Sequence, residues 1–280
     1  MPNNYVDLQT IKGTGGLNIA TAAYDGRLRA LSEHISREID RYSNRHYYFF
    51  IGTLNFDGDG SQELRINDLV AIGTLQEDTN FDGTFETNWA AADYVLYPRN
   101  ANPTGTYDLA RPYTSIRINQ ASNGTQDIFL RGMNMYQIIG TWGYNRVAHD
   151  SGLTGTMATT TITTLTLNAA ATGTVEVGHS LLLGTETVYV TATSGTSATV
   201  QRAVNLTLAA TYTATTVNII DYPGPVVEAA FIQAARLWRR KDSGFASQVG
   251  FPETGQMMAW TGGLDRDVKA LLAPYRRIAI

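Results

Sequence analysis

Apolar residues near the start of the chain recur at helical spacing. They are separated by three or four residues, which places them on one face of a helix, while charged residues fall mostly on the other faces. The apolar set is Leu28, Leu31, Ile35, Ile39 and Tyr42. The pattern predicts an amphipathic helix over about residues 19–44.

From about residue 47 to residue 144 the pattern changes to that of strands and tight turns. Turns are predicted at 55–60 and 80–83, where Asp-Gly pairs supply the positive φ angles that hairpin turns need. Aromatic and β-branched runs flank these turns, at 47–54, 64–72, 94–97, 115–118 and 136–141. This region is predicted to be an antiparallel sheet.

The stretch from 150 to 221 differs in composition from both of its flanks. It holds 21 threonines between Ser151 and Ile220, and only three charged residues, Glu176, Glu186 and Arg202. Threonine favours pleated, half-exposed strands, and glycines separate the short alternating runs. We therefore predict an inserted all-β domain, a small sandwich or barrel.

Helical spacing returns after the insert. Gly224-Pro225 is predicted to open a helix, with Glu228 near its positive end. Basic residues crowd its negative end: Arg236, Arg239, Arg240 and Lys241. A last short helix is predicted over about residues 264–272, ending before Pro274. The predicted fold class is α+β, with a helical core domain over 1–149 and 222–280, a central antiparallel β region within it, and the inserted domain over 150–221.

Composition and charge exclude several classes of function. The formal charge is -4, whereas proteins that grip nucleic acid usually carry a basic excess, so sequence-specific DNA binding is not expected. There are no cysteines, which excludes disulfides and thiolate chemistry. The N-terminal residues lack the features of a secretory signal, and no apolar run is long enough for a membrane helix. The sequence predicts a soluble protein that stays in the cytoplasm where it is made.

Candidate catalytic and cofactor groups are few. The four histidines, His34, His46, His149 and His179, are scattered, and no nucleophile motif accompanies them. The glycine-rich segment 12–16 lacks the Gly-Lys-Ser/Thr ending of a phosphate loop and is interpreted as a flexible arm. We therefore predict no enzymatic activity and no cofactor.

One turn resembles part of a calcium loop. Residues 78–83 place oxygen donors at loop positions 1, 3 and 5 and glycine at position 6, but Trp89 occupies position 12, where a bidentate glutamate is needed. Glu86 stands at position 9 instead. Two hairpin turns explain this segment and its partner at 55–63, so no metal is predicted.

The order of motifs resembles that of the head-to-tail connector (adaptor) proteins of tailed bacteriophages. Six segments carry the resemblance: 39–48, 64–70, 93–100, 112–118, 139–144 and 225–230. With the ending of the chain, the likeness covers about residues 19–148 and 222–280. The family implies a virion protein that assembles in the host cytoplasm into a ring, usually of about twelve subunits, in the neck between head and tail. Its partners would be the portal, tail or neck proteins and passing double-stranded DNA, which it would not bind sequence-specifically.

Two sets of residues are candidates for contacts in such an assembly. The C-terminal tail has apolar side chains that follow a helix-ending proline, and it is the candidate portal-docking element: Tyr275, Arg276, Arg277, Ile278 and Ile280. The basic residues at the end of the long C-terminal helix face DNA or a neighbouring subunit, or are simply solvated: Arg236, Arg239, Arg240 and Lys241. The alternatives are a calcium-dependent surface or adhesion module and a hydrolase with an unrecognised site.

Overall fold

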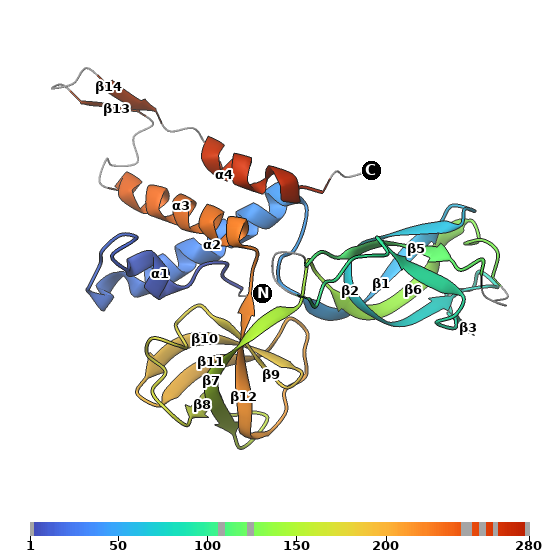
Figure 1. Ribbon diagram of the computed structural model, residues 1–280, viewed down its shortest axis with the longest axis horizontal. Coiled ribbons are helices and arrows are strands. Elements are labelled where there is room, and N and C mark those ends of the chain that lie inside the picture. The colour runs from blue at the N-terminus through green and yellow to red at the C-terminus, as the bar shows by residue number, and fades with distance from the viewer. Residues whose placement is uncertain are drawn as a thin grey trace. The chain divides into compact units, whose positions relative to one another are not determined.

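The computed structural model describes residues 3–105, 110–121, 126–241, 248–251, 256–259 and 263–277. The chain divides into two compact units. The helix–barrel unit comprises residues 1–44, 149–204 and 209–280, and the sheet unit comprises residues 45–148 and 205–208. Each unit is described by itself (Figure 1).

The predicted helical core is wrong. Strands account for 38% of the residues and helices for 22%. The helical periodicities identify real helices, but these helices share their unit with a β-barrel, and the region between residues 45 and 148 forms a separate sheet unit. The protein is therefore mostly β, with two antiparallel β assemblies.

The helices of the helix–barrel unit come from both ends of the chain. The elements are α1 (Leu8–Lys12), η1 (Ala22–Tyr24), α2 (Asp25–Ser43), α3 (Gly224–Arg240), α4 (Arg266–Leu272) and η4 (Ala273–Tyr275). Helix α2 packs on α3, and α3 packs on α4 (Figure 1). Leu28, Ile35 and Ile39 of α2 are fully buried, as their spacing predicts. A short hairpin, β13 (Gln248–Phe251) with β14 (Gln256–Ala259), lies between α3 and α4 in sequence.

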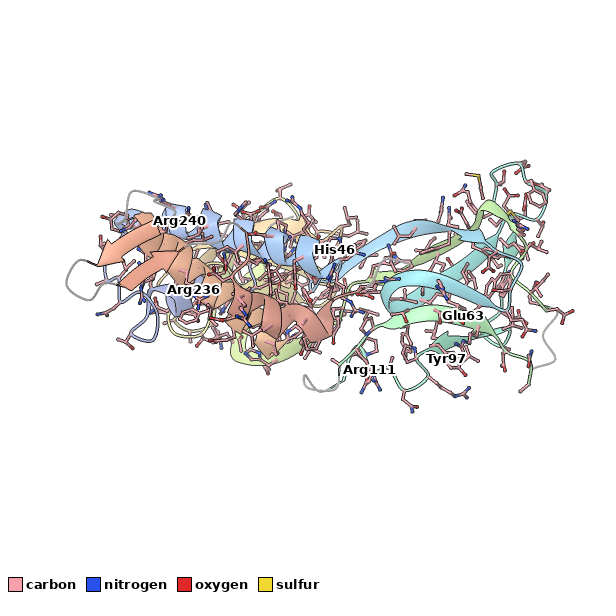
Figure 2. All side chains as sticks on the ribbon, turned by 90° about the horizontal axis from the view of Figure 1, so that it is seen from above. His46, Glu63, Tyr97, Arg111, Arg236 and Arg240 are labelled. Atoms are coloured by element: carbon pink, nitrogen blue, oxygen red, sulfur yellow. The ribbon has the colours of Figure 1, made fainter. Side chains whose placement is uncertain are left out.

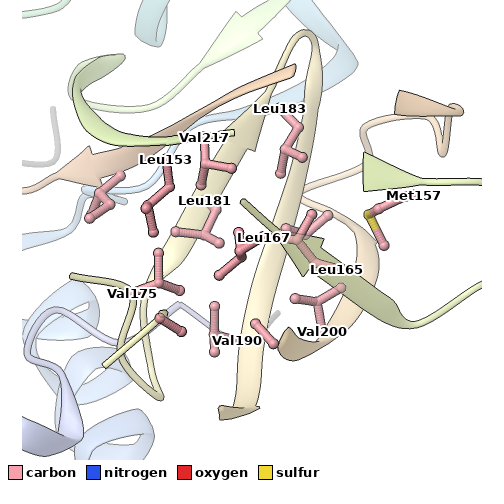
Figure 3. Packing of buried hydrophobic residues seen from close by; sticks show 14 of the residues in the cluster. Leu153, Met157, Leu165, Leu167, Val175, Leu181, Leu183, Val190, Val200 and Val217 are labelled. Carbon is pink, nitrogen blue, oxygen red and sulfur yellow. The ribbon is translucent and has the colours of Figure 1, made fainter. Parts of the chain in front are cut away.

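The threonine-rich stretch forms a closed six-stranded barrel with the strand order β10-β11-β8-β7-β12-β9. The strands are β7 (Val147–Met157), β8 (Thr164–Leu167), β9 (Ser180–Leu183), β10 (Glu186–Ser194), β11 (Ser197–Val204) and β12 (Tyr212–Asp221). Alternate side chains point into the barrel, where Leu165, Leu181 and Val190 are fully buried (Figure 3). That this insert folds on its own stays a prediction.

The N-terminal segment is not the flexible arm that its glycines suggest. Tyr5 and Ile11 are buried, and Asp7 caps α1 by accepting a hydrogen bond from the Thr10 amide at 2.8 Å. A Cβ atom on Gly16 would lie 2.4 Å from the Ile11 carbonyl oxygen, so only glycine allows this close return of the chain. The segment is held because its glycines permit tight packing.

The sheet unit is a six-stranded antiparallel sheet in which β1, β6, β2, β5 and β4 follow one another and β3 pairs with β2. The strands are β1 (Phe50–Gly58), β2 (Glu63–Glu77), β3 (Thr87–Asn88), β4 (Tyr94–Tyr97), β5 (Tyr113–Ile118) and β6 (Gly132–Trp142). The long strand β2 pairs through its first half with β5 and through its second half with β6. The hydrophobic core of the sheet unit contains Leu69, Ile116, Tyr136 and Trp142.

Candidate interaction surfaces

The basic residues of α3 do not act as one group. The Arg236 guanidinium pairs with Asp265 at 3.1 Å and with Asp267 at 2.5 Å, and these hydrogen bonds, first that of Asp267, raise its pKa. Arg236 thus joins α3 to the start of α4. Figure 2 shows Arg240 farther along α3 than Arg236, and Arg239 between them is exposed.

The end of α3 forms a second arrangement, around Trp238. The Lys241 ammonium lies 4.9 Å from the centre of the buried Trp238 ring, and the Arg27 guanidinium lies 5.7 Å from it. Tyr24 packs edge-on against the same ring at 5.3 Å and is 47% exposed. We call Tyr24, Arg27, Arg239 and Lys241 the α3-end surface. The Trp238 ring attracts Arg27 and Lys241, and Arg239 is the exposed residue that follows Trp238 in α3.

The candidate docking tail begins against α2. The Arg277 amide donates to the Ser43 carbonyl at 2.8 Å, and the Arg276 guanidinium lies 5.6 Å from the centre of the Tyr42 ring. Tyr275 ends the short helix η4. Ile278 and Ile280 lie outside the described residues, so the docking role of the tail stays a prediction.

Two of the histidines lie beside carboxylates. His149 Nδ1 lies 2.8 Å from Asp221 Oδ1, which joins the strand that enters the barrel to the one that leaves it. His179 accepts a hydrogen bond from the Glu176 amide at 3.1 Å. Its Nε2 faces Asp7. Burial acts to raise the pKa of Asp7, but the nearby His179 ring, 3.9 Å away, and the hydrogen bonds from Thr10 outweigh it and lower that pKa.

The incomplete calcium loop is a turn closed by its own backbone. Asp78 is buried, and its carboxylate accepts hydrogen bonds from the amides of Phe81 at 2.7 Å and Gly83 at 2.8 Å. The carboxylates of Asp78, Asp82 and Glu86 lie within 4.8 Å of one another. This is the one such cluster found in the described part of the chain, and hairpin geometry alone would not have placed Glu86 there.

The residue before this turn, Glu77, is a buried carboxylate with its own hydrogen-bond network. Glu77 is 2% exposed, and it accepts hydrogen bonds from the Tyr136 hydroxyl and the Trp89 indole, each at 2.9 Å. Burial, followed by the bond to Glu77, raises the pKa of Tyr136, so its proton stays in place. Trp89 stacks on Phe129 at 4.9 Å, and both rings meet Tyr136 edge-on. The network joins the ends of β2 and β6 to the loop before β6.

Apolar side chains are exposed on the segments that adjoin this network. Phe81 is 65% exposed in a left-handed conformation, which is costly for a bulky residue, and Met133 is 86% exposed. Ile128 and Leu130 are exposed at 42% and 36%. These residues belong to adjoining segments, because the Asp78 amide donates to the Met135 carbonyl and Phe81 lies beside Gly132. The sequence contains only a weak signal for this surface, a phenylalanine inside an Asp-Gly turn.

A second exposed apolar site lies on the loop between β11 and β12. Leu206 and Leu208 are 59% and 85% exposed, while Asn205 is buried and its carbonyl accepts the Ile51 amide at 3.0 Å. Ala203, Asn205 and Leu206 all have positive φ. Strained residues at fixed positions are typical of recognition loops.

Among the described residues, no helix combines the length and apolar character needed to cross a membrane. No family model matches the chain, and no curated protein or solved structure matches it. The resemblance to phage adaptors therefore has no support from these comparisons.

Proposed function

We propose that this chain is a structural virion protein, the head-to-tail adaptor of a tailed bacteriophage, which assembles as a ring beneath the portal. The observation that carries the proposal is the exposed apolar surface formed by Phe81 and Met133 on a rigid buried network. Apolar side chains held outward at fixed positions are typical of protein–protein contact sites.

The resemblance in the order of motifs is the reason for proposing this assembly rather than another. The strand motifs of the resemblance lie in β2, β4, β5 and β6 of a single sheet. The helix motifs lie in α2 and α3, which pack together although 180 residues separate Ser43 from Gly224 in the chain. The protein is mostly β, so the proposal does not include a helical core.

Co-assembly tests the proposal. The purified chain is mixed with portal rings of the same phage and imaged by electron microscopy, with portal alone as the control. We expect an added ring of density at one end of the portal. A chain that stays monomeric and shows no affinity for the portal would contradict the proposal.

A calcium-dependent surface module is the second candidate, and the convergence of Asp78, Asp82 and Glu86 favours it. Calcium binding would raise the melting temperature of the sheet unit as calcium is titrated, and Asp82→Asn would weaken that response. Under the adaptor proposal, the melting temperature is the same in calcium and in a chelator.

A further inference from the structure

The exposed end of the sheet unit combines apolar side chains with negative charge. We call this the tip surface and define it by Phe81, Ile128, Leu130, Met133 and the carboxylates around them. These carboxylates belong to Asp57, Asp59, Asp82, Glu86 and Asp127. Arg131 is the one basic residue in the described segments 57–60, 78–86 and 127–134 that form the surface.

Contacts between backbone segments hold the tip surface together. The Asn134 amide donates to Asp57 at 2.7 Å, and the Gly60 amide donates to the Phe129 carbonyl at 3.1 Å. The Leu130 amide donates to the Tyr136 hydroxyl that also binds Glu77. A surface that is ordered before binding loses little conformational entropy on contact with a partner.

Charge indicates what would cover the tip surface. The sheet unit carries eleven acidic and seven basic residues, whereas the helix–barrel unit carries fourteen of each. The α3-end surface offers the complementary chemistry, because Arg27 and Lys241 lie against the Trp238 ring, on which the exposed ring of Tyr24 also packs. Arg239, the next residue of α3, is exposed and adds a third cation. Two tip surfaces would repel each other, so contact between copies must join different surfaces.

We propose that the tip surface of one copy docks on the α3-end surface of another copy. Such head-to-tail contacts close into rings when the rotation between copies allows it. The apolar side chains of Phe81 and Met133 supply buried area, and the charges set partner choice and orientation. The inference rests on the proposed function and assigns the contact between its subunits.

Charge reversal tests the contact. Glu86→Lys with Asp127→Lys reverses the tip surface, and Arg27→Glu with Arg239→Glu reverses the α3-end surface. Self-association is measured by sedimentation over a wide concentration range, and again on portal rings by electron microscopy. We expect each double variant to raise the dissociation constant about tenfold or more, equivalent to about 1.4 kcal/mol.

The pattern of rescue separates this contact from general effects of charge. A chain with all four substitutions restores complementarity and should associate like the unmodified chain. Each double variant alone should associate weakly, whereas equal amounts of the two should associate in alternation, because the two unmodified surfaces match and the two reversed surfaces also match. The control, Glu33→Lys with Glu228→Lys, makes the same change in net charge as the tip variant but elsewhere, and it should have no effect.

An uncharged substitution tests the same contact if a charge-reversed chain does not fold. Met133→Ser removes an apolar group that is 86% exposed, and Leu208→Ser is its match at 85% exposure outside the tip surface. Only Met133→Ser should weaken self-association. Equal association of all variants overturns the inference and leaves the adaptor function standing. A chain that binds the portal but never binds itself has the same consequence, whereas a chain that binds neither overturns both.

Discussion

The Tyr136 hydroxyl on β6 donates a hydrogen bond of 2.9 Å to the carboxylate of Glu77 at the end of β2. Glu77 is buried in an aromatic cluster, and the Trp89 indole is a second donor to it. Buried polar groups need their hydrogen-bond partners, since a carboxylate out of water loses its hydration. This pair therefore fixes the base on which the tip surface is built.

Removing the Tyr136 hydroxyl should destabilise the sheet unit. Tyr136→Phe leaves one Glu77 oxygen without this donor, which we expect to cost about 1–3 kcal/mol. Urea unfolding followed by tryptophan fluorescence, to which Trp89 and Trp142 of the sheet unit contribute, measures the loss. Tyr113→Phe is the matched control, because this half-buried ring packs on the same core. Equal stability of the two variants would show that the buried bond contributes nothing.

The barrel should depend on its buried ion pair. Arg202 binds Glu186 through two hydrogen bonds of 2.7 Å, and the fully buried Glu186 also accepts the Ala203 and Ala210 amides. Arg202→Met leaves the carboxylate uncompensated, and we expect a loss of about 3–5 kcal/mol. Denaturation of the purified variant measures it, and Arg41→Met, which removes an exposed arginine of α2, provides the control for loss of one arginine.

The same carboxylate should make stability depend on acidic pH. Burial acts to raise the pKa of Glu186, but hydrogen bonds from Arg202 and the Ala210 and Ala203 amides outweigh it and lower that pKa. A lowered folded pKa stabilises the fold above the unfolded value, ordinarily 4.5, and this stabilisation is lost as pH falls through the folded value. The free energy of unfolding should therefore decrease as the pH falls below about 4.5, and it should decrease less steeply in Glu186→Gln.

Replacing Ser151–Ile220 by a short Gly-Ser linker tests the inserted domain. We expect the chain to fold and to keep the strands of residues 45–148 by circular dichroism, although the hydrogen bond from the Ile51 amide to Asn205 is lost with the insert. The N-terminal segment should become sensitive to protease, because Asn3 accepts a hydrogen bond from Ser180 at 3.0 Å and the Leu8 amide donates to the Val177 carbonyl. A variant that fails to fold would make the barrel part of the core.

Deleting Tyr275–Ile280 tests the docking tail. The deletion removes the hydrogen bond from the Arg277 amide to the Ser43 carbonyl and the contact of Arg276 with the Tyr42 ring. Because both lie at the end of the chain, we expect a stability loss of about 1 kcal/mol or less together with loss of binding to portal rings. Normal binding by the truncated chain would mean that the tail has no role in docking.

Local features of the sequence predict the elements of this protein well. The spacing of Leu28, Ile35 and Ile39 predicts α2, and Pro225 predicts the start of α3. In the turns predicted at 55–60 and 80–83, Gly60 and Gly83 have the expected positive φ, whereas Gly58 belongs to strand β1. The threonine-rich stretch predicts an all-β barrel or sandwich, and a closed barrel is what forms. These predictions hold because periodicity, turn geometry and side-chain branching act within a few residues.

Only the tertiary structure decided which elements share a unit and which side chains meet. The pairing of Glu77 with Tyr136, of Glu186 with Arg202 and the exposure of Phe81 depend on strands and loops brought together by folding. The predicted helical core was wrong for the same reason, since the helical pattern says nothing of what a helix packs against. Long-range packing carries this information, because burial depends on the whole chain whereas periodicity depends on neighbours.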